Sequence, residues 1–202
     1  MPRTKPILIL FTLVLVAACS PAAVTSTLAP TQAVQQDATP TAETLAGAQN
    51  TAASNSPAWL TLPIVNAPTG ETFTLADFAG KTVWVEPMAT WCTTCRSQLP
   101  QVEAARVALN SDQYAFISFS VAENVDNATL AQYADDQGWH WVFAVATEDL
   151  TQGLVDTFGR TVVTPPSTPH FIIKPDGSLS EISTGKPSTD EIMAELKTAS
   201  GA

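Results

Sequence analysis

The chain contains three cysteines, and two of them, Cys92 and Cys95, are separated by only two residues. The pair follows a short β-rich run and precedes a stretch with helical periodicity, so it is expected at a strand-to-helix junction. A thiol in the first turn of a helix faces free backbone N–H groups and the positive end of the helix dipole, and both favour the thiolate. Because the thiolate is the species that attacks a disulfide, the spacing predicts dithiol–disulfide exchange.

A Cys-x-x-Cys pair can also bind a metal or form an inert structural disulfide. Zinc usually takes four ligands, and the sequence has no second cysteine pair and only two histidines, His140 and His170. Copper could use Cys92, Cys95 and His170, which would make the protein a copper carrier or assembly chaperone. The copper site and the inert disulfide stay open as alternatives, whereas no zinc site is expected.

The amino terminus has the pattern of a secretory signal. Arg3 and Lys5 precede an apolar run over residues 7–16, and small residues follow before Cys19. The run is shorter than the roughly 20 residues that a membrane-spanning helix needs. We therefore expect residues 1–18 to be a signal peptide and the mature protein to act outside the cytoplasm, where disulfides persist.

The segment Val16-Ala17-Ala18-Cys19 resembles the lipobox of bacterial lipoproteins. In such proteins the cysteine is lipidated and becomes the first residue of the mature chain, so the resemblance implies that Cys19 carries acyl chains. Two or three acyl chains are enough for stable anchoring. We expect a protein held on a membrane of the cell envelope, periplasmic or on the outer cell surface. Ordinary signal cleavage beside Cys19 is the alternative.

Residues 19–56 and residues 57–202 differ in composition. The first range is rich in Ala, Thr, Ser and Pro and has few large apolar side chains, so it predicts a disordered tether. The second range predicts a single domain. Removing Arg3 and Lys5 from the 9 basic residues leaves 7 against 19 acidic ones. This balance disfavours nucleic acid and anionic lipid surfaces as partners.

Residues 57–202 alternate between strand-like and helix-like segments. Such alternation predicts an α/β domain with a partly parallel sheet covered by helices on both faces. A hairpin is expected at the start of the domain, and a second one, turning at Lys174–Gly177, makes the sheet mixed. The predicted strands are 59–65, 72–75, 83–86, 114–121, 141–145, 171–173 and 179–184, and the predicted helices follow Trp91 and span 126–138, 149–158 and 189–197.

Several short motifs resemble the thioredoxin superfamily, and most closely its exported TlpA/ResA-like thiol–disulfide oxidoreductases. The resemblance implies a thioredoxin-like fold, with a mixed central sheet flanked by helices and an N-terminal hairpin extension. It also implies that the Cys92–Cys95 disulfide is the redox-active group. The sequence shows no nucleotide or flavin fingerprint, so we expect thiol chemistry without a further cofactor. The motifs are Leu75–Lys81, Ala89-Thr90-Trp91-Cys92, Cys95-Arg96 with Pro100 beyond it, Phe171–Ile173 and Pro175–Gly177.

The resemblance assigns roles to the residues around the cysteine pair. Cys92 would be the exposed attacking thiol and Cys95 the buried resolving thiol, with Trp91 packed beside them as a shield and partner contact. Glu86 lies where thioredoxin has a buried Asp that relays a proton to or from the resolving cysteine. Burial would raise the pKa of Glu86 and suit it to act as acid and base near neutral pH. A Glu86 side chain that reaches solvent is the alternative.

The family also has a cis-proline opposite the active site, whose backbone pairs with the partner as an added strand. Thr168-Pro169 is the expected match in this sequence, and Pro166 is the alternative. His170, the next residue, either tunes the thiolate or simply occupies the strand.

The sequence therefore predicts a monomeric, membrane-tethered thiol–disulfide oxidoreductase, and the resemblance favours a reductase. Its expected partners are disulfide-containing exported proteins, which it would reduce. A membrane thiol carrier would return electrons to the cysteine pair, and the lipid anchor would be the contact with the membrane.

Overall fold

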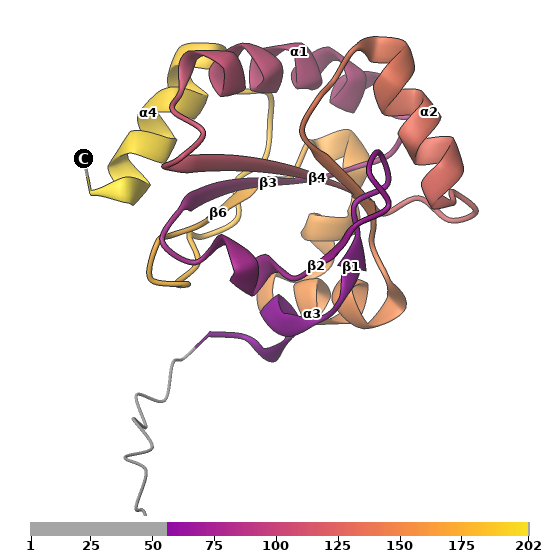
Figure 1. Cartoon of the computed structure of the whole chain (residues 1–202), viewed down its shortest axis with the longest axis horizontal. Helices are drawn as coiled ribbons and strands as arrows, with labels where there is room; N and C mark the ends of the chain where they lie inside the picture. Colours follow the sequence, from indigo (N-terminus) through magenta and orange to yellow (C-terminus); the bar gives the residue numbers. More distant parts are fainter. Residues whose placement is uncertain (1–55, 202) are drawn as a thin grey trace, which may run out of the picture. The chain divides into compact units, whose positions relative to one another are not determined.

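The structure is a computed structural model that describes residues 56–201 (Figure 1). The predicted signal peptide, the predicted lipidation site Cys19 and all of the predicted tether except Ser56 lie outside these residues. Within residues 56–201, no helix is long and apolar enough to cross a membrane.

The centre of the fold is a four-stranded sheet in the order β5-β4-β3-β6. Strands β3 and β4 pair in parallel, as do β4 and β5, whereas β6 is antiparallel to β3. The predicted mixed sheet is therefore confirmed. The strands are β3 (Thr82–Met88), β4 (Tyr114–Ser120), β5 (Val142–Val145) and β6 (Phe171–Ile173).

Four helices cover the two faces of this sheet. Figure 1 shows α1, α2 and α4 on one face and α3 on the other. Each face has its own apolar core, because Leu99, Leu130 and Ile192 pack on the first face while Leu150 and Leu154 pack on the second. The helices are α1 (Thr93–Ala108), α2 (Asn127–Gln137), α3 (Glu148–Phe158) and α4 (Thr189–Ser200).

Strand β3 is buried along its whole length. Because side chains alternate between the two faces of a strand, Trp84, Glu86 and Met88 point to the face that α1 covers. The packing agrees, since Trp84 and Met88 belong to the same core as the two cysteines. A carboxyl group in the middle of β3 is thereby placed on the cysteine side of the sheet.

The predicted N-terminal hairpin is present but shorter than expected. Strands β1 (Ile64–Val65) and β2 (Thr72–Phe73) pair antiparallel, and 3-10 helices flank them at Ala58–Thr61 and Leu75–Phe78. The first 3-10 helix lets Trp59 turn inward and pack closely against Gly153 of α3. Tertiary packing therefore replaces the outer parts of both expected strands.

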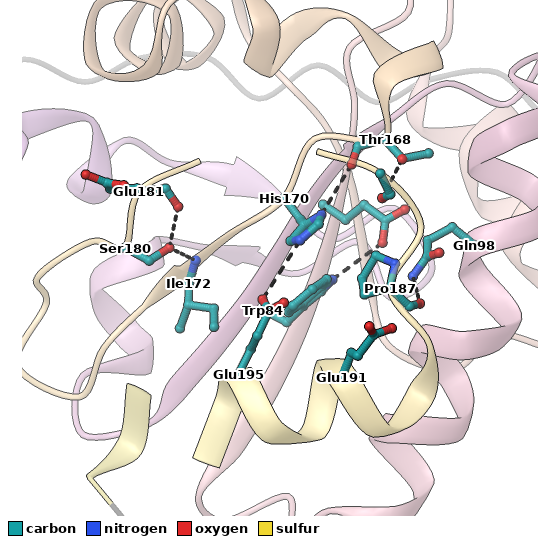
Figure 2. Close-up of polar contacts among 12 residues, drawn as sticks. Trp84, Gln98, Thr168, His170, Ile172, Ser180, Glu181, Pro187, Glu191 and Glu195 are labelled. Atoms are coloured by element: carbon teal, nitrogen blue, oxygen red, sulfur yellow. Dashed lines mark hydrogen bonds and ion pairs between the residues drawn. The ribbon is translucent and has the colours of Figure 1, made fainter. Parts of the chain in front are cut away.

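The predicted closing hairpin turns where expected, but the returning segment 179–184 is not a regular strand. The backbone N–H of Ile172 donates to the side-chain Oγ of Ser180 at 2.9 Å, as Figure 2 shows, instead of to a backbone carbonyl. The side-chain acceptor interrupts the backbone ladder between β6 and the returning segment. Only two isolated bridges remain, which join His170 to Ser183 and Ile173 to Leu179.

Helix ends agree with the capping residues read from the sequence. The side chain of Asp126 accepts the N–H of Thr129 at 2.8 Å, and Gly138 ends α2 with a φ of 70°. The side chain of Ser188 begins α4 in a capping box with Glu191. Helices α2 and α4 therefore begin and end within about one helical turn of the predicted bounds.

Candidate active site

The cysteine pair lies where the central strand β3 ends and α1 begins. Cys92 is the residue before the first turn of α1, and its Sγ accepts the backbone N–H of Cys95 at 3.2 Å. The two cysteines form a disulfide, with their Cα atoms 5.3 Å apart. The predicted position at a strand-to-helix junction is confirmed. The helix N–H groups that would stabilise a Cys92 thiolate are in place.

A proline-rich 3-10 turn, Pro165–Ser167, lies against the disulfide. The Sγ of Cys95 lies 3.1 Å from the carbonyl oxygen of Pro165. Thr94 donates its hydroxyl to the carbonyl oxygen of Pro166 at 3.2 Å, and the same hydroxyl lies 3.1 Å from the Sγ of Cys92. We call Pro165–Ser167 the proline turn. It links the cysteine pair to the segment that leads into β6.

The expectation that Cys92 is exposed is wrong for the disulfide form, because Cys92 is only 2% exposed there. Trp91 is 62% exposed, and its expected packing beside the pair stays a prediction. The carbonyl groups of the proline turn contact Thr94 and Cys95.

The prediction of a cis-proline is also wrong. No cis peptide bond occurs between residues 56 and 201, so both Pro169 and Pro166 follow trans bonds. Thr168 instead adopts a left-handed conformation with φ of 47°, and its N–H donates to the carbonyl of Pro165 at 2.8 Å. Its hydroxyl donates to the carbonyl of Gly185 at 2.5 Å. The proline turn and these hydrogen bonds hold residues 165–169 in a conformation with trans peptide bonds.

Glu86 is buried, with 1% of its surface exposed, so the alternative of a solvent-exposed side chain is wrong. Burial raises the pKa of Glu86 to about 8, and a hydrogen bond from Trp84 offsets part of that rise. The indole Nε1 of Trp84 donates to Oε2 of Glu86 at 3.4 Å. With the disulfide formed, Glu86 therefore carries a proton at neutral pH. A protonated carboxyl group is the state that can supply a proton to a leaving thiolate.

His170 contacts Trp84, Thr168 and Glu195. Its ring stacks on Trp84, with centroids 4.5 Å apart and planes 18° apart. Its Nδ1 lies 3.2 Å from the carbonyl oxygen of Thr168, and its Nε2 lies 3.9 Å from Oε2 of Glu195 (Figure 2). Burial lowers the pKa of His170, against a smaller opposing effect of that carbonyl.

The copper alternative requires Cys92, Cys95 and His170 to share one ion. In the part of the chain that the structure describes, no three His, Cys, Asp or Glu side chains are grouped so as to hold a metal. Both ring nitrogens of His170 instead face protein oxygens, those of Thr168 and Glu195. The geometry therefore gives the copper alternative no support.

Sequence reasoning missed Trp84, Thr94 and Pro165 as parts of the site. Trp84 could have been found, because it lies two residues before Glu86 in the same strand and so shares its face. Thr94 stands between the cysteines, but its contacts depend on a distant turn. Nothing in the local sequence places the Pro165 carbonyl beside Cys95.

A disulfide-bonded Cys-x-x-Cys at the start of the first long helix, beside the central strand of a mixed sheet, defines a thioredoxin-like protein. Within that class, the chain belongs to the Redoxin family, whose pattern matches residues 46–198. No curated protein matches the chain.

Solved structures with the same fold include several bacterial thiol proteins. A thiol:disulfide interchange protein of the thioredoxin family from Chlorobium tepidum is 24% identical, with a TM-score of 0.57 over 71% of this chain and 95% of that one. BsSco, a Sco-family cytochrome c oxidase assembly protein with a disulfide switch, is 19% identical (TM-score 0.54, 68% and 90% covered). The exposed lipoprotein thioredoxin Etrx1 of Streptococcus pneumoniae is 22% identical (TM-score 0.51, 68% and 98% covered).

These similarities show the fold, and the family match extends over most of the domain. Together with the Cys92–Cys95 disulfide, they support a thiol–disulfide oxidoreductase. The predicted fold class is thus confirmed.

Proposed function

We propose that the protein is an extracytoplasmic thiol–disulfide oxidoreductase, anchored through a lipid on Cys19, that reduces disulfides of exported proteins. The observation that carries the proposal is the Cys92–Cys95 disulfide at the start of α1, with the buried carboxyl group of Glu86 on the same face of the sheet. The oxidised pair is the product of one turnover.

The first step of the reaction forms a mixed disulfide. The thiolate of Cys92 attacks one sulfur of the partner's disulfide, so a new S–S bond forms and the partner's other sulfur leaves as a thiolate. The backbone N–H of Cys95, 3.2 Å from the Sγ of Cys92, favours this thiolate. Thr94 can donate its hydroxyl to the same sulfur once it leaves the carbonyl of Pro166.

The second step releases the partner. The carboxylate of Glu86 takes the proton of the Cys95 thiol, and the resulting thiolate attacks the Sγ of Cys92. The Cys92–Cys95 disulfide forms, and the partner's remaining sulfur leaves as a thiolate. The cysteine pair has lost two electrons and the partner has gained them, while the proton of Cys95 rests on Glu86.

The same proton then serves regeneration. A dithiol donor, which we propose to be a membrane thiol carrier, attacks Cys92 and displaces Cys95. The leaving thiolate of Cys95 takes the proton from Glu86, and a second thiolate of the donor completes the reduction. A pKa of about 8 for Glu86 in the disulfide form suits this return step, because the proton is present at neutral pH.

Partner binding must open the site. The proline turn contacts the cysteine pair, and the N–H and carbonyl groups of Thr168 already contact Pro165 and His170. We propose that a partner segment displaces these contacts and binds along Thr168-Pro169. The exposed ring of Trp91 would then pack on the partner beside its disulfide.

Membrane attachment and the direction of the exchange reaction are proposed from the sequence. The lipobox-like segment ending at Cys19 and the tether after it support attachment to a membrane, and Etrx1 is described as an exposed lipoprotein. The resemblance to TlpA/ResA-like proteins supports a reductase.

Trapping in cells tests the exchange reaction. A Cys95→Ala variant can form the mixed disulfide but cannot resolve it, so we expect partner proteins bound to Cys92 and released by reductant. The matched control, Cys92→Ala, removes the attacking sulfur and should bind none. If both variants trap the same proteins or neither traps any, the exchange mechanism is wrong.

Lipidation needs its own experiment. Metabolic labelling with an alkyne fatty acid should mark the wild-type protein, and fractionation should place it with membranes. Cys19→Ser should lose both the label and the membrane association. A wild-type protein without the label would contradict the lipid anchor while leaving the exchange chemistry untouched.

A further inference from the structure

The two carboxyl oxygens of Glu86 have different surroundings. Oε2 accepts the hydrogen bond from Nε1 of Trp84 at 3.4 Å. Oε1 is buried and has no hydrogen-bonding partner among the described residues. Buried polar atoms nearly always have partners, so an unpartnered one in a native site calls for an explanation.

Trp84 is held firmly enough to orient this carboxyl group. It is fully buried in β3, and its ring stacks on His170 (Figure 2). The imidazole is held in turn at Nδ1 by the carbonyl of Thr168, and Glu195 lies on the side of its Nε2. The indole N–H is therefore directed at one place, the Oε2 of Glu86.

The sheet register brings the same residues together independently. Trp84 pairs with Ile172 and Val85 with Phe171 in the antiparallel ladder between β3 and β6. Continued by one residue, this register places His170 across from Glu86, and opposite residues of an antiparallel pair share a face. Cys95 packs in the same core as Trp84.

We propose that Trp84 is a positioning residue of this reaction, which anchors Oε2 of Glu86 and so leaves Oε1 to exchange a proton with Cys95. The proposal rests on the exchange mechanism given above. It explains why Oε2 of Glu86 has a hydrogen-bond donor and Oε1 has none. In this account the stacking of Trp84 on His170 orients the indole N–H.

Other titratable or charged groups surround Glu86 and its aromatic neighbours, and each can affect a titration. The strand β4 places Ser118, which does not titrate, beside Glu86 in the ladder. The titratable and charged groups are His170 before β6, Glu195 on α4, Tyr133 on α2 and Arg96 on α1. Cys95 is bonded to Cys92 in the oxidised protein and does not titrate there.

A hydrogen bond to a carboxylate is stronger than one to the neutral acid, so the indole N–H favours the charged form of Glu86. Trp84→Phe keeps an aromatic ring against His170 but removes the N–H donor. The loss of one donor to a buried carboxylate should raise the pKa of Glu86 by about one unit.

The test is a carbon-13 NMR titration of the Glu86 side-chain carboxyl carbon in the oxidised protein, assigned with Glu86→Gln. We expect the midpoint to rise by about one pH unit in Trp84→Phe. The matched control is Trp141→Phe. Trp141 is buried in the same core, but its Nε1 donates to Ser118 at 2.9 Å. Its loss should leave the midpoint of Glu86 within about 0.3 units.

A second variant keeps the test decisive if Trp84→Phe does not fold. His170→Ala retains the indole N–H but removes the ring that holds it, so the midpoint of Glu86 should rise by a smaller amount. An unchanged midpoint in the folded variant, or an equal rise in Trp141→Phe, would overturn the positioning role.

Kinetics supply the functional part of the test. Resolution of a preformed mixed disulfide should slow about tenfold in Trp84→Phe at pH 7. In a Glu86→Gln background the same substitution should cause no further slowing, and an undiminished effect there would contradict the proposal. The titration needs no partner protein. A failed trapping experiment with a shifted midpoint would thus reject the exchange function alone, whereas an unshifted midpoint with successful trapping would reject the positioning role alone.

Discussion

The buried carboxyl group of Glu86 should make the stability of the oxidised protein depend on pH. In the folded protein its pKa is about 8, against an ordinary value of 4.5 that we take for the unfolded chain. Between these two values the folded state keeps a proton that the unfolded state has lost. Stability therefore falls as pH rises from about 4.5 to about 8, because the folded state binds more protons there.

The size of the effect follows from the difference between the two pKa values. The gap is about 3.5 pH units, and each unit corresponds to about 1.4 kcal/mol, so the total is on the order of 5 kcal/mol. Glu86→Gln removes the titrating group but keeps an oxygen for the Trp84 N–H. The variant should gain stability relative to wild type by about 1.4 kcal/mol per pH unit across this window.

Urea denaturation of both proteins at pH 5, 6, 7 and 8, with the disulfide intact, measures this difference. Glu123→Gln is the control, because it removes a carboxyl group from an exposed loop and should follow the wild-type curve. If the stability difference between Glu86→Gln and wild type is flat across the four values, Glu86 is not held protonated in the folded protein. The proton shuttle would then lose its basis.

Three further substitutions test other contacts. Thr94→Val removes the hydroxyl 3.1 Å from the Sγ of Cys92, so alkylation of Cys92 in the reduced protein at pH 7 should slow about tenfold; an unchanged rate would show that Thr94 does not assist the thiolate. Gly153→Ala would place a Cβ 2.7 Å from Trp59 and should destabilise the fold by about 1–3 kcal/mol in urea, whereas an unchanged midpoint would mean that Trp59 moves aside freely. Thr147→Ala removes the side chain that accepts an N–H at the start of α3 and should cost about 1 kcal/mol in the same assay, which an unaltered stability would refute.

The regular elements were predictable from local patterns. The apolar run of β3, the Asp126 and Gly138 ends of α2 and the Ser188 cap of α4 all lie where the sequence indicates. These signals are local because capping and alternation involve residues a few positions apart. The outer arm of the first hairpin was not predictable, since Trp59 turns inward to pack on a helix far along the chain.

The chemistry of the site was partly predictable. The runs on either side of the pair place Cys92 and Cys95 at a helix start, and the resemblance to thioredoxin points to Glu86 as a buried acid. The covering of the cysteine pair was not predictable. It depends on carbonyl groups of the proline turn, which every residue has, and on long-range contacts such as that between Thr168 and Gly185.

The role of His170 was also not predictable from the local sequence. Its residue type allows a metal ligand, a thiolate neighbour or a plain strand residue, and only the fold decides among them. The antiparallel register of β6 against β3 turns it toward Trp84. Such pairing joins residues about 85 positions apart, and no local pattern contains it.

The most direct test of the central claim is the stoichiometry of a single turnover with a peptide disulfide, followed by thiol alkylation and mass spectrometry. The reduced wild-type protein should end with the Cys92–Cys95 disulfide and release both peptide thiols. Cys95→Ala should stop with one peptide half on Cys92 and one thiol released. A peptide disulfide that stays intact, or an adduct on Cys95 in the wild-type protein, would contradict the account.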